Sequence, residues 1–239
     1  MYVNFNSRFY GLGYTDYFLK KNVSLNLKGV FFFQKGVMRI GKSNFFTGLK
    51  YTLFKGATAF HPIPDFLKQY TDQDFTISDL NALMIYDTRD NFFSPSKGFL
   101  SQIEMRYSDD WLGASASYLG LNSYLLGYTP ILKKHQIGMR CSYNMIQSDA
   151  PFFAQPFVSN RGVAFFRYQD VQVLEAEVEM MFNVYKRWYV LGFAGTGDAY
   201  GTNSTVFGKD VSTSGGAGFR YLIARKFGMK AGIDFAWDE

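Results

Sequence analysis

The clearest pattern in the sequence is Phe99-Leu100-Ser101-Gln102-Ile103-Glu104-Met105-Arg106-Tyr107. Apolar side chains at positions 99, 103, 105 and 107 share one side of an extended chain, and polar side chains at positions 102, 104 and 106 share the other. This division follows because successive side chains of a strand point to opposite faces. The period of two therefore predicts a β-strand with one apolar and one charged face.

Three other stretches repeat this alternation, and in each of them one face could touch hydrocarbon while the other carries polar groups. The sets are Val23, Leu25, Leu27, Phe31 and Phe33 against Ser24, Asn26 and Lys28; Ile137, Met139, Cys141 and Tyr143 against Arg140, Ser142 and Asn144; and Met229, Ile233, Phe235 and Trp237 against Lys230 and Asp234. Along the whole chain this pattern predicts about ten strands, near residues 22–34, 45–55, 77–88, 98–108, 112–128, 135–147, 169–184, 188–197, 213–224 and 228–237.

A soluble sandwich of two sheets would show the same alternation, with its apolar faces packed together. The expected strands, however, are mostly about 10 to 16 residues long, whereas soluble strands have about 5 to 6 and a tilted membrane strand about 9 to 11. Aromatic residues near strand ends are typical of membrane-surface girdles, and here they are Tyr107, Trp111, Trp188, Tyr189 and Trp237. We therefore expect an all-β, antiparallel transmembrane β-barrel, with about ten strands present of about 12 or 16.

The composition agrees with a membrane barrel and argues against other classes of protein. Aromatic residues make up 19% of the 239 residues and charged residues only 19%, yet no uncharged apolar run approaches the roughly 18 residues of a membrane helix. The net charge of +5 is spread thinly, without the basic block of a nucleic-acid-binding arm. With one cysteine, two histidines and no serine in a nucleophile elbow, we expect no metal, no cofactor, no catalytic residues and no enzymatic activity.

The connections between the expected strands mostly alternate in length, as do the short periplasmic turns and longer outer loops of outer-membrane barrels. The longer ones cover residues 57–76, 148–168 and 198–212, the shorter ones residues 35–44, 89–97, 129–134, 185–187 and 225–227, and the short outer link 108–111 is an exception. We expect one barrel domain over residues 1–239, incomplete at both ends, because the start lacks a secretory signal and the last strand runs outward to Glu239.

A polar turn lies between the expected strands at 77–88 and 98–108. It reads Tyr86-Asp87-Thr88-Arg89-Asp90-Asn91, followed by Pro95 and Lys97-Gly98. Asp, Asn, Pro and Gly are ordinary turn residues, which accounts for a turn but not for the whole ordered string. The string resembles the Asp-Thr/Ser-Arg-Asp-Asn, then Pro-Thr-Arg/Lys-Gly, turn of the BamA/TamA (bacterial surface antigen) family. The resemblance assigns to this turn motif the residues Asp87, Arg89, Asp90, Asn91 and Gly98.

A second resemblance lies in the long outer loop expected at residues 148–168. Arg161-Gly162 is similar to the Arg-Gly-Phe/Tyr motif that BamA-like proteins carry in a loop that folds back into the lumen, although Val163 stands where the family has an aromatic residue. In the family, a second acid that meets this arginine lies one strand further on, within an x-Asp-x-Gly motif. The corresponding residues 192–197 lack that acid, so a lock on this arginine is expected to rest on the strand before them, at residues 169–184. The resemblance covers about residues 79–238.

The chemistry of that loop can be argued from its residues. An arginine inside a lumen needs a carboxylate partner, preferably in bidentate geometry. The strand after the loop carries three acids two residues apart, Glu175, Glu177 and Glu179, which are too costly for a lipid face and should face the lumen. We hypothesise that Arg161, beside Gly162, pairs with Glu175 or Glu177 and locks the loop inside the barrel. The alternative is that these acids only line a wet pore.

The resemblance implies a role in inserting or translocating proteins at the outer membrane of a Gram-negative bacterium, at a seam that opens to a client strand. The expected partners are outer-membrane lipids and client outer-membrane or secreted proteins. Two alternatives stay open: a passive outer-membrane pore, and a membrane anchor barrel for an upstream enzyme domain.

Overall fold

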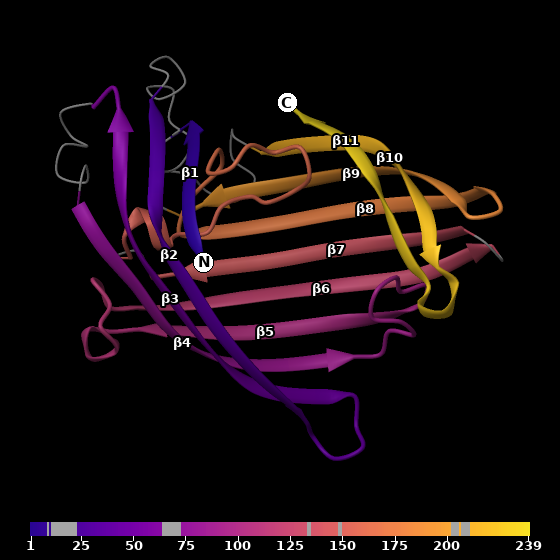
Figure 1. The fold of residues 1–239 in the computed structure, drawn as a ribbon, viewed down its shortest axis with the longest axis horizontal. Helices are drawn as coiled ribbons and strands as arrows, with labels where there is room; N and C mark the ends of the chain where they lie inside the picture. Colours follow the sequence, from indigo (N-terminus) through magenta and orange to yellow (C-terminus); the bar gives the residue numbers. More distant parts are fainter. Residues whose placement is uncertain are drawn as a thin grey trace.

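The structure, a computed structural model, describes residues 1–8, 10, 23–63, 73–132, 135–147, 150–201, 206 and 211–239. These residues form one antiparallel sheet of 11 strands that pair in sequence order (Figure 1). The strands are β1 (Tyr2–Arg8), β2 (Ser24–Arg39), β3 (Phe45–His61), β4 (Gln73–Asp87), β5 (Gly98–Ser108), β6 (Tyr118–Leu132), β7 (His135–Ile146), β8 (Gln172–Tyr185), β9 (Trp188–Tyr200), β10 (Ser212–Ala224) and β11 (Met229–Asp238). The all-β, antiparallel fold expected from the sequence is confirmed.

Within the part of the chain that the structure describes, short 3-10 helices occupy three of the connections: η2 (Asp110–Leu112), η3 (Phe152–Ala154) and η4 (Arg225–Phe227). Among the described helices, none has the length and apolar character required to cross a membrane.

Every expected strand is present, but several bounds differ. β1 was not expected, because it is short and polar; it forms by pairing with β2 from Tyr2 opposite Val30 to Arg8 opposite Ser24. β2 and β3 run on to residues 39 and 61, so the links predicted at 35–44 and 57–76 are shorter. β6 begins only at residue 118, so the link that follows β5 is long and the predicted exception at 108–111 disappears. Parts of the predicted links 57–76, 129–134, 148–168 and 198–212 lie outside the described residues.

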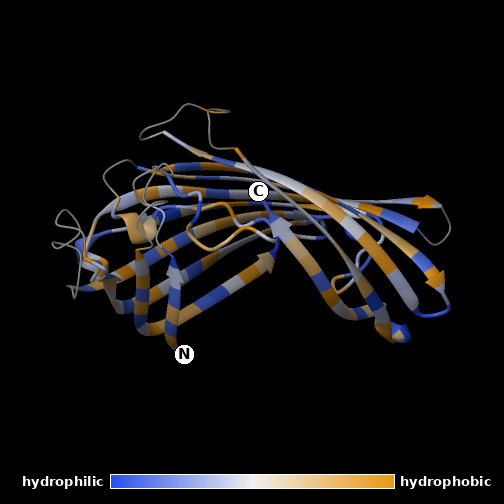
Figure 2. Cartoon of the chain, turned by 90° about the horizontal axis from the view of Figure 1, so that it is seen from above, coloured by the Kyte–Doolittle hydropathy of each residue, from blue (hydrophilic) through white to orange (hydrophobic). Residues whose placement is uncertain are grey.

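Hydrophobic and hydrophilic residues alternate along the strands (Figure 2), which gives the sheet one apolar and one charged face. On β5, Ile103 and Met105 are 47% and 60% exposed, whereas Glu104 between them is buried. Residues paired across antiparallel strands lie on the same face, so the pairing of Met84 with Ile103 carries the apolar face onto β4. Exposed side chains on this face include Phe99, Tyr107, Met139, Met145, Trp188, Val190, Ile233, Phe235 and Trp237.

The opposite face is concave and carries ion pairs. Arg106 of β5 pairs with Asp79 of β4 at 2.7 Å, and Arg220 of β10 pairs with Asp234 of β11 at 2.5 Å. An uncompensated charge removed from water costs several kcal/mol, and these ion pairs offset that cost for the charged residues of the inner face.

The connection between β7 and β8 fills the concave side, and residues 150–171 are called the inner loop below. Its Phe153 stacks on Phe75 of β4 with 3.9 Å between ring centroids. Its Asn160 donates to the carbonyl oxygen of Thr196 on β9 at 2.8 Å, and its Arg167 pairs with Asp238 of β11. One loop reaches strands this far apart in the sheet because the sheet curls around it (Figure 1). The inward fold predicted for this loop is therefore present.

The inner loop also reverses the expected orientation of β2. Val23 and Leu25 were expected to face lipid, yet they are 0% and 2% exposed and pack inward with Phe60. Phe152 and Phe166 of the inner loop cover this cluster. The prediction was wrong here because alternation shows that one face is apolar, but not what that face meets.

The convex face of the same strand end is polar. Asn26 of β2 donates through Nδ2 to Oδ1 of Asn4 on β1 at 3.2 Å and also to Asn6. An amide cluster of this kind is unsuited to hydrocarbon. This end of the β1–β2 pair therefore belongs outside any apolar layer that surrounds the other strands.

Candidate functional site

The inner loop has its own hydrogen-bonded structure. Phe157 and Gln169 form an isolated antiparallel bridge, and the N–H of Val158 donates to the carbonyl oxygen of Tyr168 at 2.8 Å. The side chain of Gln169 is fully buried and donates to the carbonyl oxygen of Phe152 at 2.7 Å. Backbone groups away from water must find partners, and these bonds supply them. The loop can therefore hold its side chains in a fixed geometry.

Arg161 of this loop is surrounded by three acids. Its Nε and Nη2 donate to Oε1 of Glu177 at 3.1 and 2.8 Å. Its Nη1 donates to Oε2 of Glu179 at 2.8 Å and to Oδ2 of Asp234 at 3.1 Å. The guanidinium also lies 3.7 Å from the ring centroid of Phe193, in a cation–π contact. Charge-assisted hydrogen bonds are the strong ones in proteins, so this cluster fixes the tip of the loop.

The sequence left Glu175 and Glu177 as alternative partners of Arg161, and the geometry selects Glu177. Glu175 binds the loop by another route: Oε1 accepts from the backbone N–H and the hydroxyl of Ser159, and Oε2 accepts from the hydroxyl of Ser142 at 2.6 Å. Glu175 is 2% exposed. It therefore anchors the residues just before Arg161 instead of pairing with the arginine.

Asp234 is a partner that the sequence reasoning missed. The sequence predicts that the acids around Arg161 come from β8 alone, because residues 192–197 on β9 lack the family's acid. Asp234 lies 73 residues after Arg161 and reaches it from β11, while also pairing with Arg220. Phe193 contributes a ring at the guanidinium where an acid was lacking.

Gly162 is the residue that lets the loop approach β11. Its φ of +96° is one that other residues rarely adopt, and a Cβ there would come within 2.8 Å of the carbonyl oxygen of Trp237. The next residue, Val163, packs against a buried cluster that includes Val158 and Tyr168. Val163 thus has an apolar packing role at the position where the family has an aromatic residue.

Asn160 is a further site residue that sequence reasoning missed. It is 2% exposed; its Oδ1 accepts from Nη2 of Arg140 at 2.7 Å, and its Nδ2 donates to the carbonyl oxygen of Thr196 at 2.8 Å. Its only sequence signal is its place directly before Arg161.

The turn motif lies between β4 and β5. Asp87 accepts from Nε and Nη2 of Arg89 at 3.0 and 2.9 Å and from the Arg89 backbone N–H at 3.0 Å. Asp90 accepts from the hydroxyl and the N–H of Ser96 at 2.5 and 2.8 Å, and from the N–H of Lys97 at 3.2 Å. Asp87 therefore stabilises the start of the turn at Arg89, and Asp90 stabilises its end at Ser96 and Lys97.

Asn91 and Gly98 complete the turn. Oδ1 of Asn91 accepts from the N–H of Phe93 at 2.8 Å, and Nδ2 donates to the carbonyl oxygen of Phe227 in η4 at 2.9 Å. Gly98 has a φ of +94°, and a Cβ there would meet the carbonyl oxygen of Thr88 at 2.4 Å. The motif therefore builds its own turn and ties it to the turn between β10 and β11.

We expect Asp90 to make the stability of this turn depend on pH. Burial alone would raise its pKa, but hydrogen bonds from Ser96 and Lys97 outweigh burial and hold the pKa below its ordinary value of 3.8. A carboxyl with a depressed folded-state pKa contributes stability above its unfolded pKa, and that stability is lost as the pH falls through the folded pKa. We expect Asp90→Asn to lower the urea midpoint of unfolding near neutral pH, and this difference to shrink below about pH 4. A pH-independent difference would contradict the assignment.

Comparison with solved structures places this architecture among known folds. The chain is similar to BamA from Haemophilus ducreyi in a crystal structure lacking POTRA domains 1–3, with a TM-score of 0.61 and 14% sequence identity. The fold is that of a BamA β-barrel. The similarity covers 99% of this chain, which spans 58% of that BamA chain. No family model and no curated protein matches the sequence. The BamA-like barrel expected from the two motifs is confirmed as a fold.

Proposed function

We propose that this chain is a barrel of a Gram-negative outer membrane that assists the insertion or translocation of other proteins. The proposed partners are outer-membrane lipids and client outer-membrane or secreted proteins, with no nucleic acid and no enzymatic step. The apolar convex face supports the location. An arginine or lysine at the middle of a lipid face costs about 2–4 kcal/mol, and the ion pairs of β4, β5, β10 and β11, with Arg106 and Arg220, lie on the concave face.

The observation that carries this proposal is how the inner loop contacts both edges of the sheet. At the β1 edge, the hydroxyl of Ser7 donates to the carbonyl oxygen of Phe165 at 3.2 Å. At the β11 edge, Arg167 pairs with Asp238, and the hydroxyl of Tyr168 donates to the carbonyl oxygen of Glu239 at 3.1 Å. Among the described residues, β1 and β11 share no backbone ladder.

Side-chain contacts of this kind can be released without breaking a ladder of backbone hydrogen bonds. A free strand edge is a template for another chain, because its unpaired N–H and C=O groups accept an added strand. Release of the inner loop from β1 would therefore let an incoming client strand pair with the sheet.

The experiment is to tether the loop to the edge. Cys141 is replaced by serine, and Ser7 and Phe165 are both replaced by cysteine, so that oxidation closes the contact and a reductant reopens it. The rate at which an unfolded outer-membrane barrel inserts is compared between liposomes that contain this protein and empty liposomes. We expect the reduced protein to accelerate insertion over the rate in empty liposomes, and the oxidised protein to give no acceleration. The Cys141→Ser parent is the control, and the insertion rate that it gives should be the same after oxidation and after reduction. Equal acceleration in both redox states would refute the use of this edge.

A passive pore is a second candidate, favoured by the charged inner face. Against this reading, the inner loop occupies the concave side of the sheet. The β4–β5 turn also reaches other elements: Nε2 of Gln136 on β7 donates to the carbonyl oxygen of Pro95 at 3.4 Å, and Asn91 donates to the carbonyl oxygen of Phe227. We expect a small conductance in planar bilayers that rises in Arg161→Ala as the loop is released. A large, steady conductance in the wild type would favour the pore.

A further inference from the structure

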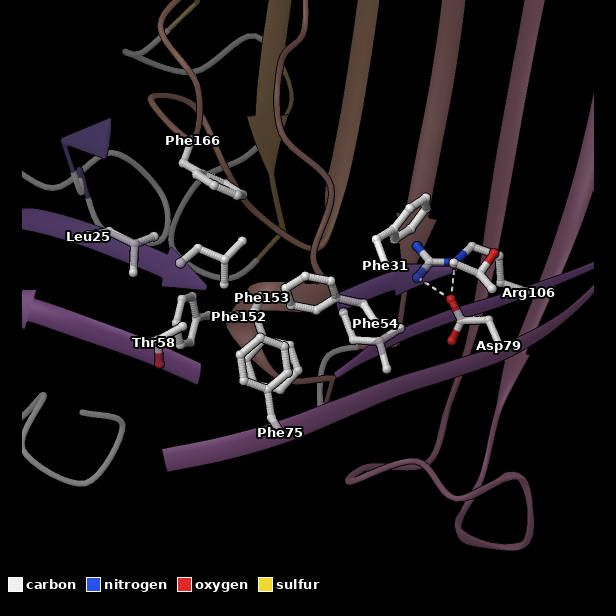
Figure 3. Close-up of a pocket in the computed structure, with 13 residues that line it drawn as sticks. Leu25, Phe31, Phe54, Thr58, Phe75, Asp79, Arg106, Phe152, Phe153 and Phe166 are labelled. Carbon is white, nitrogen blue, oxygen red and sulfur yellow. Dashed lines mark hydrogen bonds and ion pairs between the residues drawn. The ribbon is translucent and has the colours of Figure 1, made fainter. Parts of the chain in front are cut away.

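A cavity of about 240 Å³ lies on the concave side of the sheet, between the inner loop and strands β2 to β5 (Figure 3). Its wall is mostly apolar and includes the rings of Phe31, Phe54, Phe75, Phe152, Phe153 and Phe166. At one end the apolar lining stops at the ion pair of Asp79 and Arg106. None of these residues takes part in the Arg161 cluster, so the cavity is a separate feature of the lumen.

The rings that form the cavity are held by one another. Phe153 stacks on Phe75 with 3.9 Å between centroids, and Phe54 lies 5.5 Å from Phe75. Phe152 meets Phe153 edge-on at 5.5 Å, and its carbonyl oxygen is fixed by Gln169 at 2.7 Å. The wall is therefore preformed by strands and loop together, as is usual for ligand sites.

The size and lining of the cavity indicate what it can hold. An apolar cavity of about 150 Å³ stays dry and binds benzene, whereas sites for drug-sized molecules occupy about 300–1,000 Å³. At about 240 Å³ this one is large enough for a single alkyl chain and too small for a whole lipid. A polar head group would remain at the Asp79–Arg106 end, where the apolar lining ceases.

Aromatic contacts connect the cavity to the edge of the sheet. The ring centroid of Phe166, which lines the cavity, lies 6.5 Å from that of Phe5 on β1 and 4.7 Å from that of Phe157. The ring centroids of Phe165 and Phe5 are 5.2 Å apart. Within the described sheet β1 is the first strand, so this series of rings extends from that side of the sheet to the cavity.

We propose that this cavity binds the saturated chain of a single-chain amphiphile of medium length, such as a fatty acid. The chain lies between the inner loop and β2 to β4, and the head group stays beside Asp79 and Arg106. This inference does not depend on the proposed role in protein insertion.

The test uses a photoreactive analogue of decanoic acid that carries a diazirine at the end of its chain. It is added to the folded barrel in nanodiscs, irradiated, and the adducts are mapped by peptide mass spectrometry. We expect adducts on cavity residues, above all in the peptide containing Phe152 and Phe153, and we expect an excess of unlabelled decanoate or decanol to suppress them. Adducts confined to convex residues such as Leu49 and Met84, without competition, would overturn the proposal.

Two variants of one strand separate the cavity from the convex surface. Thr52 lines the cavity, and Thr52→Phe fills it, so the inner adduct should fall by at least about tenfold. Leu49 is 60% exposed on the opposite face of β3, and Leu49→Phe should leave the inner adduct unchanged. A heat-dependent gel shift verifies that both variants fold. An undiminished inner adduct in folded Thr52→Phe would refute the assignment.

A second variant keeps the proposal testable if Thr52→Phe does not fold. Phe153→Ala removes the ring stacked on Phe75 and enlarges the cavity, so longer fatty acids should compete for the inner adduct better than they do in the wild type. An unchanged preference for chain length would count against binding at this place.

Discussion

We expect the replacement of Arg161 with alanine to lower the free energy of unfolding of the barrel by about 3 kcal/mol. Removing one partner of a buried ion pair costs about 3–5 kcal/mol, because the remaining charge is left uncompensated. The side chains of Arg161 and Glu177 are 28% and 9% exposed, which places the expected loss at the lower end of that range. Glu179 and Asp234 would be left facing Glu177 without the cation between them, so repulsion adds to the loss.

The measurement is urea unfolding of the detergent-solubilised barrel, followed by tryptophan fluorescence. A parallel trypsin digestion reports the loop, since release from the cluster should expose the bond after Arg167. Arg161→Lys restores the charge but not the two-nitrogen contact with Glu177 or the flat contact with Phe193, and should give an intermediate loss.

Two further variants serve as controls for Arg161. Arg225 is exposed in η4, and Arg225→Ala should change stability by no more than about 0.5 kcal/mol. Combining Arg161→Ala with Glu177→Gln should cost less than the sum of the two single changes, because the two residues interact directly. If Arg161→Ala retains wild-type stability and protease resistance, the cluster does not hold the loop.

Replacing Gly162 with alanine is expected to cost about 2 kcal/mol. A side chain at a positive φ stores about 1–3 kcal/mol of strain, and the added Cβ meets the backbone of Trp237 within 2.8 Å. The contact is with backbone, which cannot rotate away, so the loop must move off β11. Loss of the Arg167–Asp238 pair should follow, and the unfolding midpoint should drop.

A matched control for Gly162 lies on β6. Gly127 has no positive φ, and a Cβ built there has nothing within 4 Å, so Gly127→Ala should be neutral within about 0.5 kcal/mol. Equal unfolding midpoints for the Gly162 and Gly127 variants would show that the close approach to β11 has no energetic weight.

The residues of the site differ in how far sequence could predict them. Glu177 was accessible, because it follows the Arg-Gly motif on the next strand and its alternation with apolar residues assigns it to the lumen. Asp234 was not accessible as a partner, since its contact with Arg161 requires the sheet to curl until β11 meets the inner loop. Phe193 gave no signal at all, because an aromatic residue in a strand is usually a packing residue.

The amino-acid sequence by itself determined that the chain forms long antiparallel strands with one apolar and one charged face, because that division follows from a side-chain period of two. It also determined that the loop after β7 carries an arginine that needs acids. Only the tertiary structure decided which acids these are, which side of β2 is buried, and that rings from β2 to β4 and the inner loop line a cavity. Those features depend on contacts between strands and a loop far apart in sequence, and local periodicity contains no information about which faces meet after the sheet curls.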